Sequence, residues 1–121
     1  MTRAKDDAIE QRIEDEVVVD AHNAEERALG WFYYLDGHLN VPFKARCRHA
    51  LPGSPLRAGD IVDVLGMAPE WACDTDMLVR IRRGGKQVGV PLAQLKPLSN
   101  DRETREAADD WHYWVDRGYA L

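Results

Sequence analysis

The chain has 121 residues, of which 45% are hydrophobic and 31% are charged, and its net charge at neutral pH is −5. These values are typical of one globular domain with an ordinary core, so we treat residues 1–121 as a single domain. The longest apolar run has six residues, far below the roughly 20 that cross a bilayer. The charged first residues lack the apolar segment of a secretion signal, and we expect a cytoplasmic protein.

Charge is distributed unevenly along the chain. Residues 1–26 carry a net charge of −6, residues 43–98 carry +4 and residues 99–121 carry −3. Because opposite charges attract, we expect the acidic ends to pack against the basic middle. The acidic total disfavours nucleic acid and anionic membranes as partners, since both require a positive field.

Two helices are predicted in residues 1–40. The first spans residues 5–19, where apolar positions recur at helical spacing and acids fill the other face. The second begins after Asn23, which can form a capping box with Glu26, and Asp36-Gly37 provides its stop. Its expected inner face is lined by Ala28, Leu29, Phe32, Leu35 and Leu39.

Residues 43–98 change to the two-residue period of β-strands. Gly84-Gly85 marks a tight hairpin, and Pro91 predicts that its strand lies at a sheet edge or ends there. Four to five short strands predict a small, strongly bent barrel, and their pattern resembles that of SH3-like barrels. In that pattern a helical turn precedes the last strand, here within residues 90–98.

The last predicted helix spans residues 100–118. Asn100 and Glu103 can form its capping box, and Gly118 lies just past its end. Its apolar stripe comprises Ala107, Ala108, Trp111, Trp114 and Val115. The predicted fold class is therefore α+β, a small SH3-like bent β-barrel flanked by two N-terminal helices and one C-terminal helix.

Two aromatic runs, residues 31–34 and 111–114, allow two interpretations. They can form a platform for a ligand, or they can pack as the joint between helices and barrel, which helical spacing favours. The alternative function is that of a protein-interaction module that binds an unidentified protein partner. An exposed apolar patch formed by Trp31, Tyr34 and Trp111 would favour it. The binding face of such a module would also include basic strand residues, unless these pair within the chain. They are Lys44, Arg46, Arg48, Arg80 and Arg82.

The sequence contains no recognisable catalytic constellation. Cys47, His49 and Cys73 lack the paired ligand spacing of structural zinc sites. Cys47 falls on the inward side of its strand, which predicts a buried, unreactive thiol. A phosphate-binding glycine loop and a nucleophile elbow are both absent from the sequence. We therefore expect a binding protein rather than an enzyme.

Carboxylates provide the strongest chemical signal. Glu70, Asp74 and Asp76 lie in one loop, where alternate acids can turn oxygens toward one point, and Ca²⁺ takes six to eight oxygen ligands. Asp36 is another candidate, because carbonyls at a helix C-terminus add negative potential. The same spacing also describes a solvated acidic loop, since it fixes no ligand number.

These acids do not form an EF-hand. Counted from Asp74, position six of the loop is Val79 where an EF-hand has glycine. Position twelve is Gly85 where an EF-hand has glutamate. Any calcium site in this chain is therefore of another kind.

Several unusual stretches resemble the CcbP-like calcium-binding proteins known from cyanobacteria and other bacteria. They are residues 12–21 (RIEDEVVVDA), 30–43 (GWFYYLDGHLNVPF), 59–70 (GDIVDVLGMAPE), 90–98 (VPLAQLKPL) and 109–119 (DDWHYWVDRGY). The resemblance implies a small, acidic, intracellular protein that binds Ca²⁺ without EF-hands, as a buffer or sensor in calcium signalling. It places one family site residue on Asp36, while Glu70, Asp74 and Asp76 rest on loop chemistry. We expect low-affinity surface sites, with dissociation constants of about 10⁻⁶–10⁻⁴ M.

Overall fold

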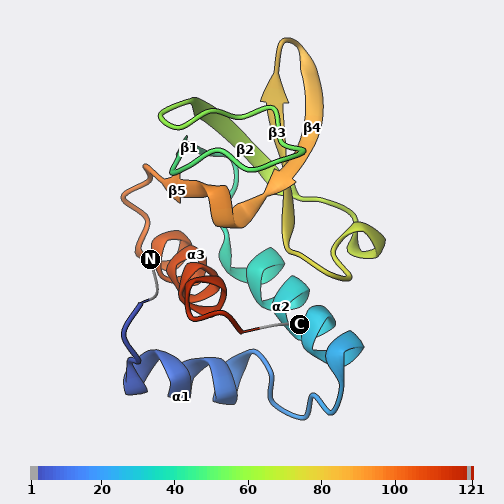
Figure 1. Cartoon of the computed structure of the whole chain (residues 1–121), viewed down its shortest axis with the longest axis vertical. Coiled ribbons are helices and arrows are strands. Elements are labelled where there is room, and N and C mark those ends of the chain that lie inside the picture. Colours follow the sequence, from blue (N-terminus) through green and yellow to red (C-terminus); the bar gives the residue numbers. More distant parts are fainter. Residues whose placement is uncertain (1–2, 120) are drawn as a thin grey trace.

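A computed structural model describes residues 3–119 and residue 121. Its helices are α1 (Asp7–Glu16), α2 (Ala24–His38) and α3 (Arg102–Asp116). Its strands are β1 (Phe43–Cys47), β2 (Ile61–Met67), β3 (Leu78–Arg83), β4 (Lys86–Pro91) and β5 (Leu95–Pro97), with 3₁₀ turns η1 (Glu70–Ala72) and η2 (Leu92–Gln94). The sheet forms one end of the molecule, α2 and α3 pack beneath it, and α1 crosses the opposite end (Figure 1). The predicted α+β class with two N-terminal helices and one C-terminal helix is confirmed.

All five strands form one antiparallel sheet in the order β4-β3-β2-β1-β5. In β1, Phe43, Ala45 and Cys47 are buried while the intervening basic residues face solvent, as the two-residue period predicts. The β3–β4 turn places Gly84 and Gly85 at φ +58° and +77°, the conformation that glycine adopts in tight hairpins. The turn η2 precedes β5, as the SH3-like pattern predicts, and β4 is an edge strand that ends at Pro91.

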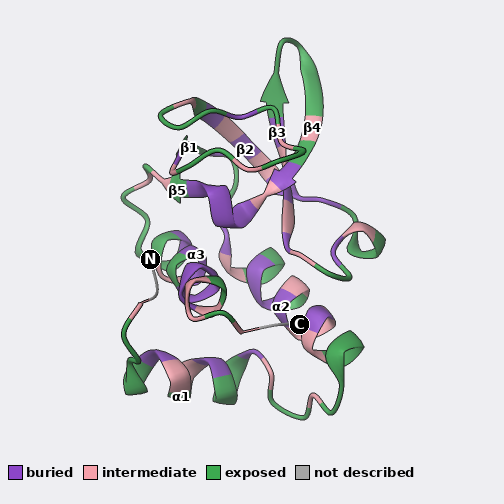
Figure 2. Ribbon diagram, viewed as in Figure 1, coloured by how far each residue is buried: buried purple, intermediate pink, exposed green. Residues whose placement is uncertain are grey.

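Aromatic side chains of α2 and α3 pack together in the core. The Trp31 ring packs against Trp111 and Trp114, with ring centroids 4.9 and 5.6 Å apart, and against Tyr34 at 6.0 Å. Trp31, Tyr34 and Trp111 are all buried, and buried positions line the helix faces that meet the sheet (Figure 2). We call this cluster of Trp31, Tyr34, Trp111 and Trp114, together with the α1 and α3 residues packed around it, the helical joint. The packing interpretation of the two aromatic runs is confirmed for Trp31, Tyr34, Trp111 and Tyr113, whereas Tyr33 is exposed.

One buried carboxylate connects all three helices. Asp110 on α3 is fully buried and pairs with the Arg12 guanidinium of α1 through two hydrogen bonds. The Tyr34 hydroxyl of α2 donates to the same carboxylate at 2.7 Å. Burial, together with the hydrogen bond to this carboxylate, raises the pKa of Tyr34 well above its usual range, and Arg12 stays charged. The acidic N-terminus is thus anchored through an ion pair.

Gly30 permits the close approach of α1 and α2. A Cβ atom at this position would lie 2.3 Å from the Val17 carbonyl oxygen, which is closer than atoms can pack. Val17 caps the C-terminus of α1 and is itself buried. The glycine that opens the GWFYYLDG run therefore has a packing role.

Three predicted details of the helices are wrong. The helix α2 does not stop at Asp36-Gly37 but continues to His38, because the Leu39 amide bonds to the Leu35 carbonyl and the His38 ring bonds to the Tyr34 carbonyl. At the start of α3, the carboxylate of Asp101, rather than the side chain of Asn100, caps the helix. Val115 in the predicted stripe is exposed, since it follows the buried turn of α3.

Within the described residues, no helix combines the length and apolar character that crossing a bilayer requires.

Candidate functional site

Residues 68–77, which we call the carboxylate loop, connect β2 to β3. The loop is closed at its base, where the Ala68 amide donates to the Leu78 carbonyl at 2.9 Å. Its first half forms the turn η1, in which the Cys73 amide donates to the Glu70 carbonyl at 3.0 Å. Cys73 and Met77 are buried below the turn and give the loop an apolar floor. The loop is thus a defined structure that can hold side chains in place.

The loop presents its acids on the outer side of this floor. Glu70 and Asp74 are exposed, whereas Asp76 is partly buried. Trp71, between them, is 80% exposed and is the most exposed large hydrophobic side chain in the described residues. The loop therefore combines solvent-facing carboxylates with an aromatic ring that does not contribute to the core.

Asp76 has an unusual environment for a carboxylate. Partial burial raises its pKa above the usual value, and a backbone contact with Met77 opposes that shift. Among the described residues, no Lys, Arg or His side chain forms an ion pair with Asp76. Burying part of a carboxylate without a cation partner costs free energy, which a bound cation would offset.

A single hydrogen bond ties the carboxylate loop to α2. The Tyr33 hydroxyl donates to Glu70 at 3.1 Å, although Tyr33 is 59% exposed. The carboxylate raises the pKa of the Tyr33 hydroxyl. Sequence reasoning missed Tyr33 as a site residue. Its position three residues before Asp36, and so on the same helix face, was the available signal.

The exposed carboxylate of Asp36 lies in the last turn of α2. The partial negative charge of a helix C-terminus makes this an unfavourable position for an acid without a cation. Within residues 3–119 and 121, no three His, Cys, Asp or Glu side chains are close enough together to hold one metal ion. The structure thus brings Glu70 to the helix that carries Asp36, but it does not gather Asp36, Asp74 and Asp76 around a common point.

The alternative interaction surface is not supported by the aromatic residues that would form it. Trp31 is 0%, Tyr34 is 6% and Trp111 is 2% exposed, so they form no surface patch. The predicted burial of Cys47 is confirmed, and burial raises the pKa of its thiol. The cysteines and His49 also form no metal-binding group within the described residues.

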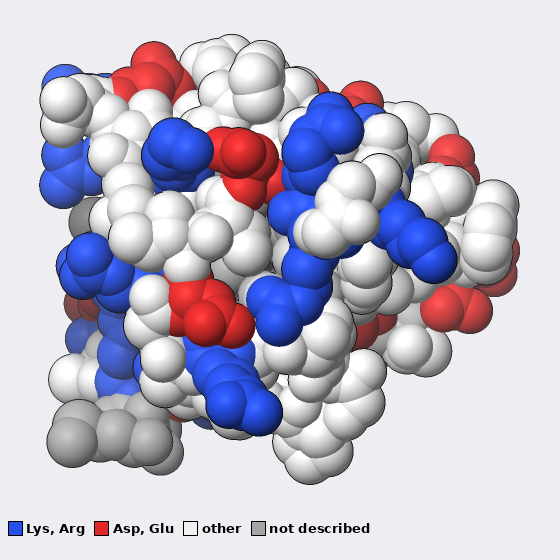
Figure 3. Space-filling model, turned by 90° about the horizontal axis from the view of Figure 1, so that it is seen from above, with Lys and Arg blue, Asp and Glu red and all other residues white. Residues whose placement is uncertain are grey.

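Pairing within the chain accounts for part of the basic strand residues. Lys44 pairs with Asp63 at 2.9 Å, and Arg80 donates to the Met67 carbonyl at 3.1 Å. Arg48 bonds to Asp116 and to the Ala93 carbonyl. Unpaired bases remain at this end of the molecule, where Lys and Arg side chains predominate over Asp and Glu (Figure 3). The side chains of Arg46 and Arg82 have no hydrogen-bond or ion-pair partner among the described residues.

The fold and the loop define a small α+β protein with exposed acids at one side of its sheet. The sequence profile of the CcbP family, described as calcium binding, matches residues 11–115, and the chain belongs to this family. Two solved structures are similar over nearly the whole chain. The crystal structure of CcbP from Anabaena is 38% identical, with a TM-score of 0.87 and complete coverage of both chains.

The second structure is that of a calcium-binding protein in its calcium-binding form. It is also 38% identical, with a TM-score of 0.85, and the match covers 97% of this chain and 96% of the other. No curated protein matches the sequence. The resemblance inferred from the sequence motifs is therefore confirmed, and the family is one of calcium-binding proteins rather than of enzymes.

Proposed function

We propose that this protein binds Ca²⁺ through the carboxylates of the carboxylate loop and the last turn of α2, and that it acts as a calcium buffer or sensor in the cytoplasm. The observation that carries the proposal is the partly buried carboxylate of Asp76, which has no cation partner in the described residues. Membership of the CcbP family and the similarity to a structure in its calcium-binding form support the choice of ion.

The ligand chemistry favours calcium over other metals. Glu70, Asp74, Asp76 and Asp36 offer only oxygen atoms, which hard cations prefer. A surface loop tolerates the irregular six-to-eight-fold coordination of Ca²⁺ more readily than the strict octahedron of Mg²⁺. Backbone carbonyls and water would complete the shell, because the acids alone are too few.

Both parts of the site gain from a bound cation. At Asp36, positive charge offsets the negative end of the α2 dipole. At Asp76, it offsets the cost of burying a carboxylate. Because the acids of the described residues do not converge on one point, binding must draw the loop inward, and we expect a modest dissociation constant of about 10⁻⁶–10⁻⁴ M.

Trp71 makes binding measurable in the native protein. Its ring lies next to Glu70 and is 80% exposed, whereas Trp31 and Trp111 are buried. Calcium titration should change the fluorescence of Trp71 and produce heat in a calorimeter with the same midpoint. Saturation at 100 times the dissociation constant should add about 2.7 kcal/mol to the free energy of unfolding. Absence of heat and of any thermal shift at millimolar calcium would refute the proposal.

Single-residue variants assign the ligands. Asp76→Asn and Glu70→Gln should each weaken binding by about tenfold, since site charge sets the affinity. Glu14→Gln is the matched control, because Glu14 is an exposed acid on α1, far along the chain from the loop. A loss of affinity in this control equal to that in the loop variants would show that only the overall charge of the protein matters.

Amide NMR separates the two roles. A buffer needs only local closure, so shifts would remain within residues 68–77 and the end of α2. A sensor must alter a surface that a partner can read. The exposed rings of Tyr33 and Trp71 beside the site are the surface that such a change would move.

A further inference from the structure

A second polar site lies beside the first turns of α3, separate from the carboxylate loop. It is an open cleft of about 820 Å³ between α3, β5 and α1. In Figure 1, α3 and β5 lie on one side of the molecule, and η1 lies on the other. Positively charged side chains dominate the walls of this cleft. They belong to Arg12, Arg48, Lys96, Arg102 and Arg105. We call it the cationic cleft. Its volume falls in the range of small-molecule sites, about 300–1,000 Å³.

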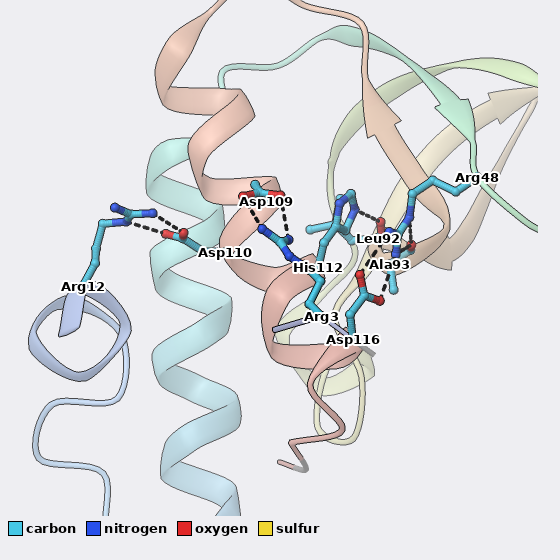
Figure 4. A network of polar contacts seen from close by, with 9 residues as sticks. All are labelled: Arg3, Arg12, Arg48, Leu92, Ala93, Asp109, Asp110, His112 and Asp116. Atoms are coloured by element: carbon cyan, nitrogen blue, oxygen red, sulfur yellow. Dashed lines mark hydrogen bonds and ion pairs between the residues drawn. The ribbon is translucent and has the colours of Figure 1, made fainter. Parts of the chain in front are cut away.

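Two of these five cations are already engaged in structural pairs. Arg12 is held by the buried carboxylate of Asp110, and Arg48 is held by Asp116 and the Ala93 carbonyl (Figure 4). Asp109, an acid of the lining, pairs with Arg3 at 2.9 Å. These pairs fix the cleft walls and neutralise three of the surrounding acids, Asp109, Asp110 and Asp116.

The other three cations have no partner among the described residues. Lys96 on β5 and Arg102 and Arg105 on α3 are exposed, and none of their side chains forms an ion pair or hydrogen bond with residues 3–119 or 121. Arg102 and Arg105 are three residues apart and therefore lie on one face of α3. Arg46 stands directly opposite Lys96 across the β1–β5 pairing, which extends the positive wall. A strongly positive surface has thus formed on a protein whose net charge is −5.

We propose that the cationic cleft binds a small anion that carries two or more linked phosphate groups. Guanidinium groups bind phosphate oxygens through two parallel hydrogen bonds, and Lys96 adds a point charge from the opposite wall. Glu106, which also lines the cleft and pairs with Arg12 at 3.7 Å, still repels negative charge and so disfavours a weakly charged anion. A chain of phosphates can reach the cations on both walls at once, and this gain exceeds that repulsion.

His112 contributes shape rather than charge to the floor of the cleft. Its ring is buried, with its Nε2 atom 3.3 Å from the Leu92 carbonyl oxygen. Burial and the nearby Arg48 lower its pKa to about 4, so the ring is neutral at physiological pH. The positive potential of the cleft therefore persists over the neutral pH range and does not depend on a titrating group.

Titration with inorganic pyrophosphate in calcium-free buffer tests this site independently of calcium binding. The test variant is Arg102→Gln/Arg105→Gln, and the matched control is Arg82→Gln/Lys86→Gln, which removes two exposed charges from β3 and β4. Because two charge-assisted contacts are lost, the test variant should bind pyrophosphate at least about tenfold more weakly. The control should change affinity less than twofold, and NMR shifts in the native chain should centre on Lys96, Arg102 and Arg105.

A parallel titration with ADP distinguishes a free phosphate chain from a nucleotide. Equal affinities identify the phosphates as the whole ligand, and tighter binding of ADP extends the ligand to its nucleoside. The proposal is overturned if the native chain does not bind pyrophosphate saturably at physiological salt. It is also overturned if the control variant loses as much affinity as the test variant.

Discussion

The helical joint and the carboxylate loop each contain a carboxylate that is removed from solvent, but only the joint provides it with a cation. In the joint, the carboxylate of Asp110 is fully buried and is satisfied by Arg12 and Tyr34, so it fastens three helices together. In the loop, the carboxylate of Asp76 is partly buried and has no such partner in the described residues. The difference is that Asp110 has its cation within the fold, whereas Asp76 has none among the described residues, and this is the difference on which the proposed calcium site rests.

The largest effect should follow when the joint is deprived of its cation. Arg12→Gln leaves Asp110 buried without a counter-charge, and the free energy of unfolding should fall by about 3 kcal/mol. Lys44→Gln is the control, since Lys44 and Asp63 form an exposed pair with 67% and 46% exposed side chains, and such pairs contribute below about 1 kcal/mol. Urea unfolding measures both. Equal losses would show that burial does not set the value of the Asp110 pair.

Acid should weaken the joint through His112. The pKa of this buried ring is lowered to about 4, first by burial and then by Arg48, whereas it is about 6.5 in the unfolded chain. The unfolded chain therefore binds the proton more tightly. This contribution is complete above about pH 6.5 and declines by about 2–3 kcal/mol as the pH falls toward 4.

Unfolding of the native protein and of His112→Gln at pH 7 and pH 4.5 measures the histidine contribution, because the other titrating groups are common to both. The variant should lose clearly less stability between the two pH values. If both lose the same amount, the ring is accessible to protons in the folded state, and the joint is less closed than its burial indicates.

A pair of glycines in α2 tests how closely the helices pack. Gly30→Ala would place a Cβ atom against the Val17 carbonyl, and overpacking of this kind costs about 2 kcal/mol. Gly37→Ala lies in the same helix with nothing within 4 Å, and it should stabilise by about 0.5–1 kcal/mol, because alanine restricts the unfolded chain. Thermal unfolding should therefore shift in opposite directions.

The smallest change in stability is expected in the loop, where it should have the opposite sign to that in the joint. Burial raises the pKa of Asp76 above its unfolded value, so its contribution to stability is present in acid and is lost as the pH rises through the folded pKa. Asp76→Asn should therefore slightly stabilise the ion-free protein at neutral pH while weakening calcium binding about tenfold. Destabilisation at neutral pH would place Asp76 with Asp110 as a structural acid.

Much of the fold could be predicted because its signals are local. The N-cap at Asn23 accepts a hydrogen bond from Glu26, and the Gly84-Gly85 turn has the expected positive φ angles. The errors occurred where tertiary contacts overrode local preference. The helix α2 continues past Gly37 because Leu39 is buried, and the sequence around Gly37 does not predict that burial.

The candidate site was less accessible from the sequence. The acids at 70, 74 and 76 are visible as a pattern, but whether Asp76 is buried depends on how the loop folds over its own floor of Cys73 and Met77. The bond between Tyr33 and Glu70 joins residues 37 positions apart, and no spacing rule predicts such a pair. The cationic cleft likewise arises only when α3 packs beside β5.

The buried thiol of Cys73 lies on the inner side of the carboxylate loop and is 2% exposed, with its pKa raised by burial. A thiol in this state reacts with an alkylating reagent only while the loop is open, so its labelling rate measures how often the loop opens. Cys47, equally buried in β1, has a labelling rate that reports opening of the sheet in the same molecule. A bound ion that holds the loop closed should slow the labelling of Cys73 and leave the labelling of Cys47 unchanged.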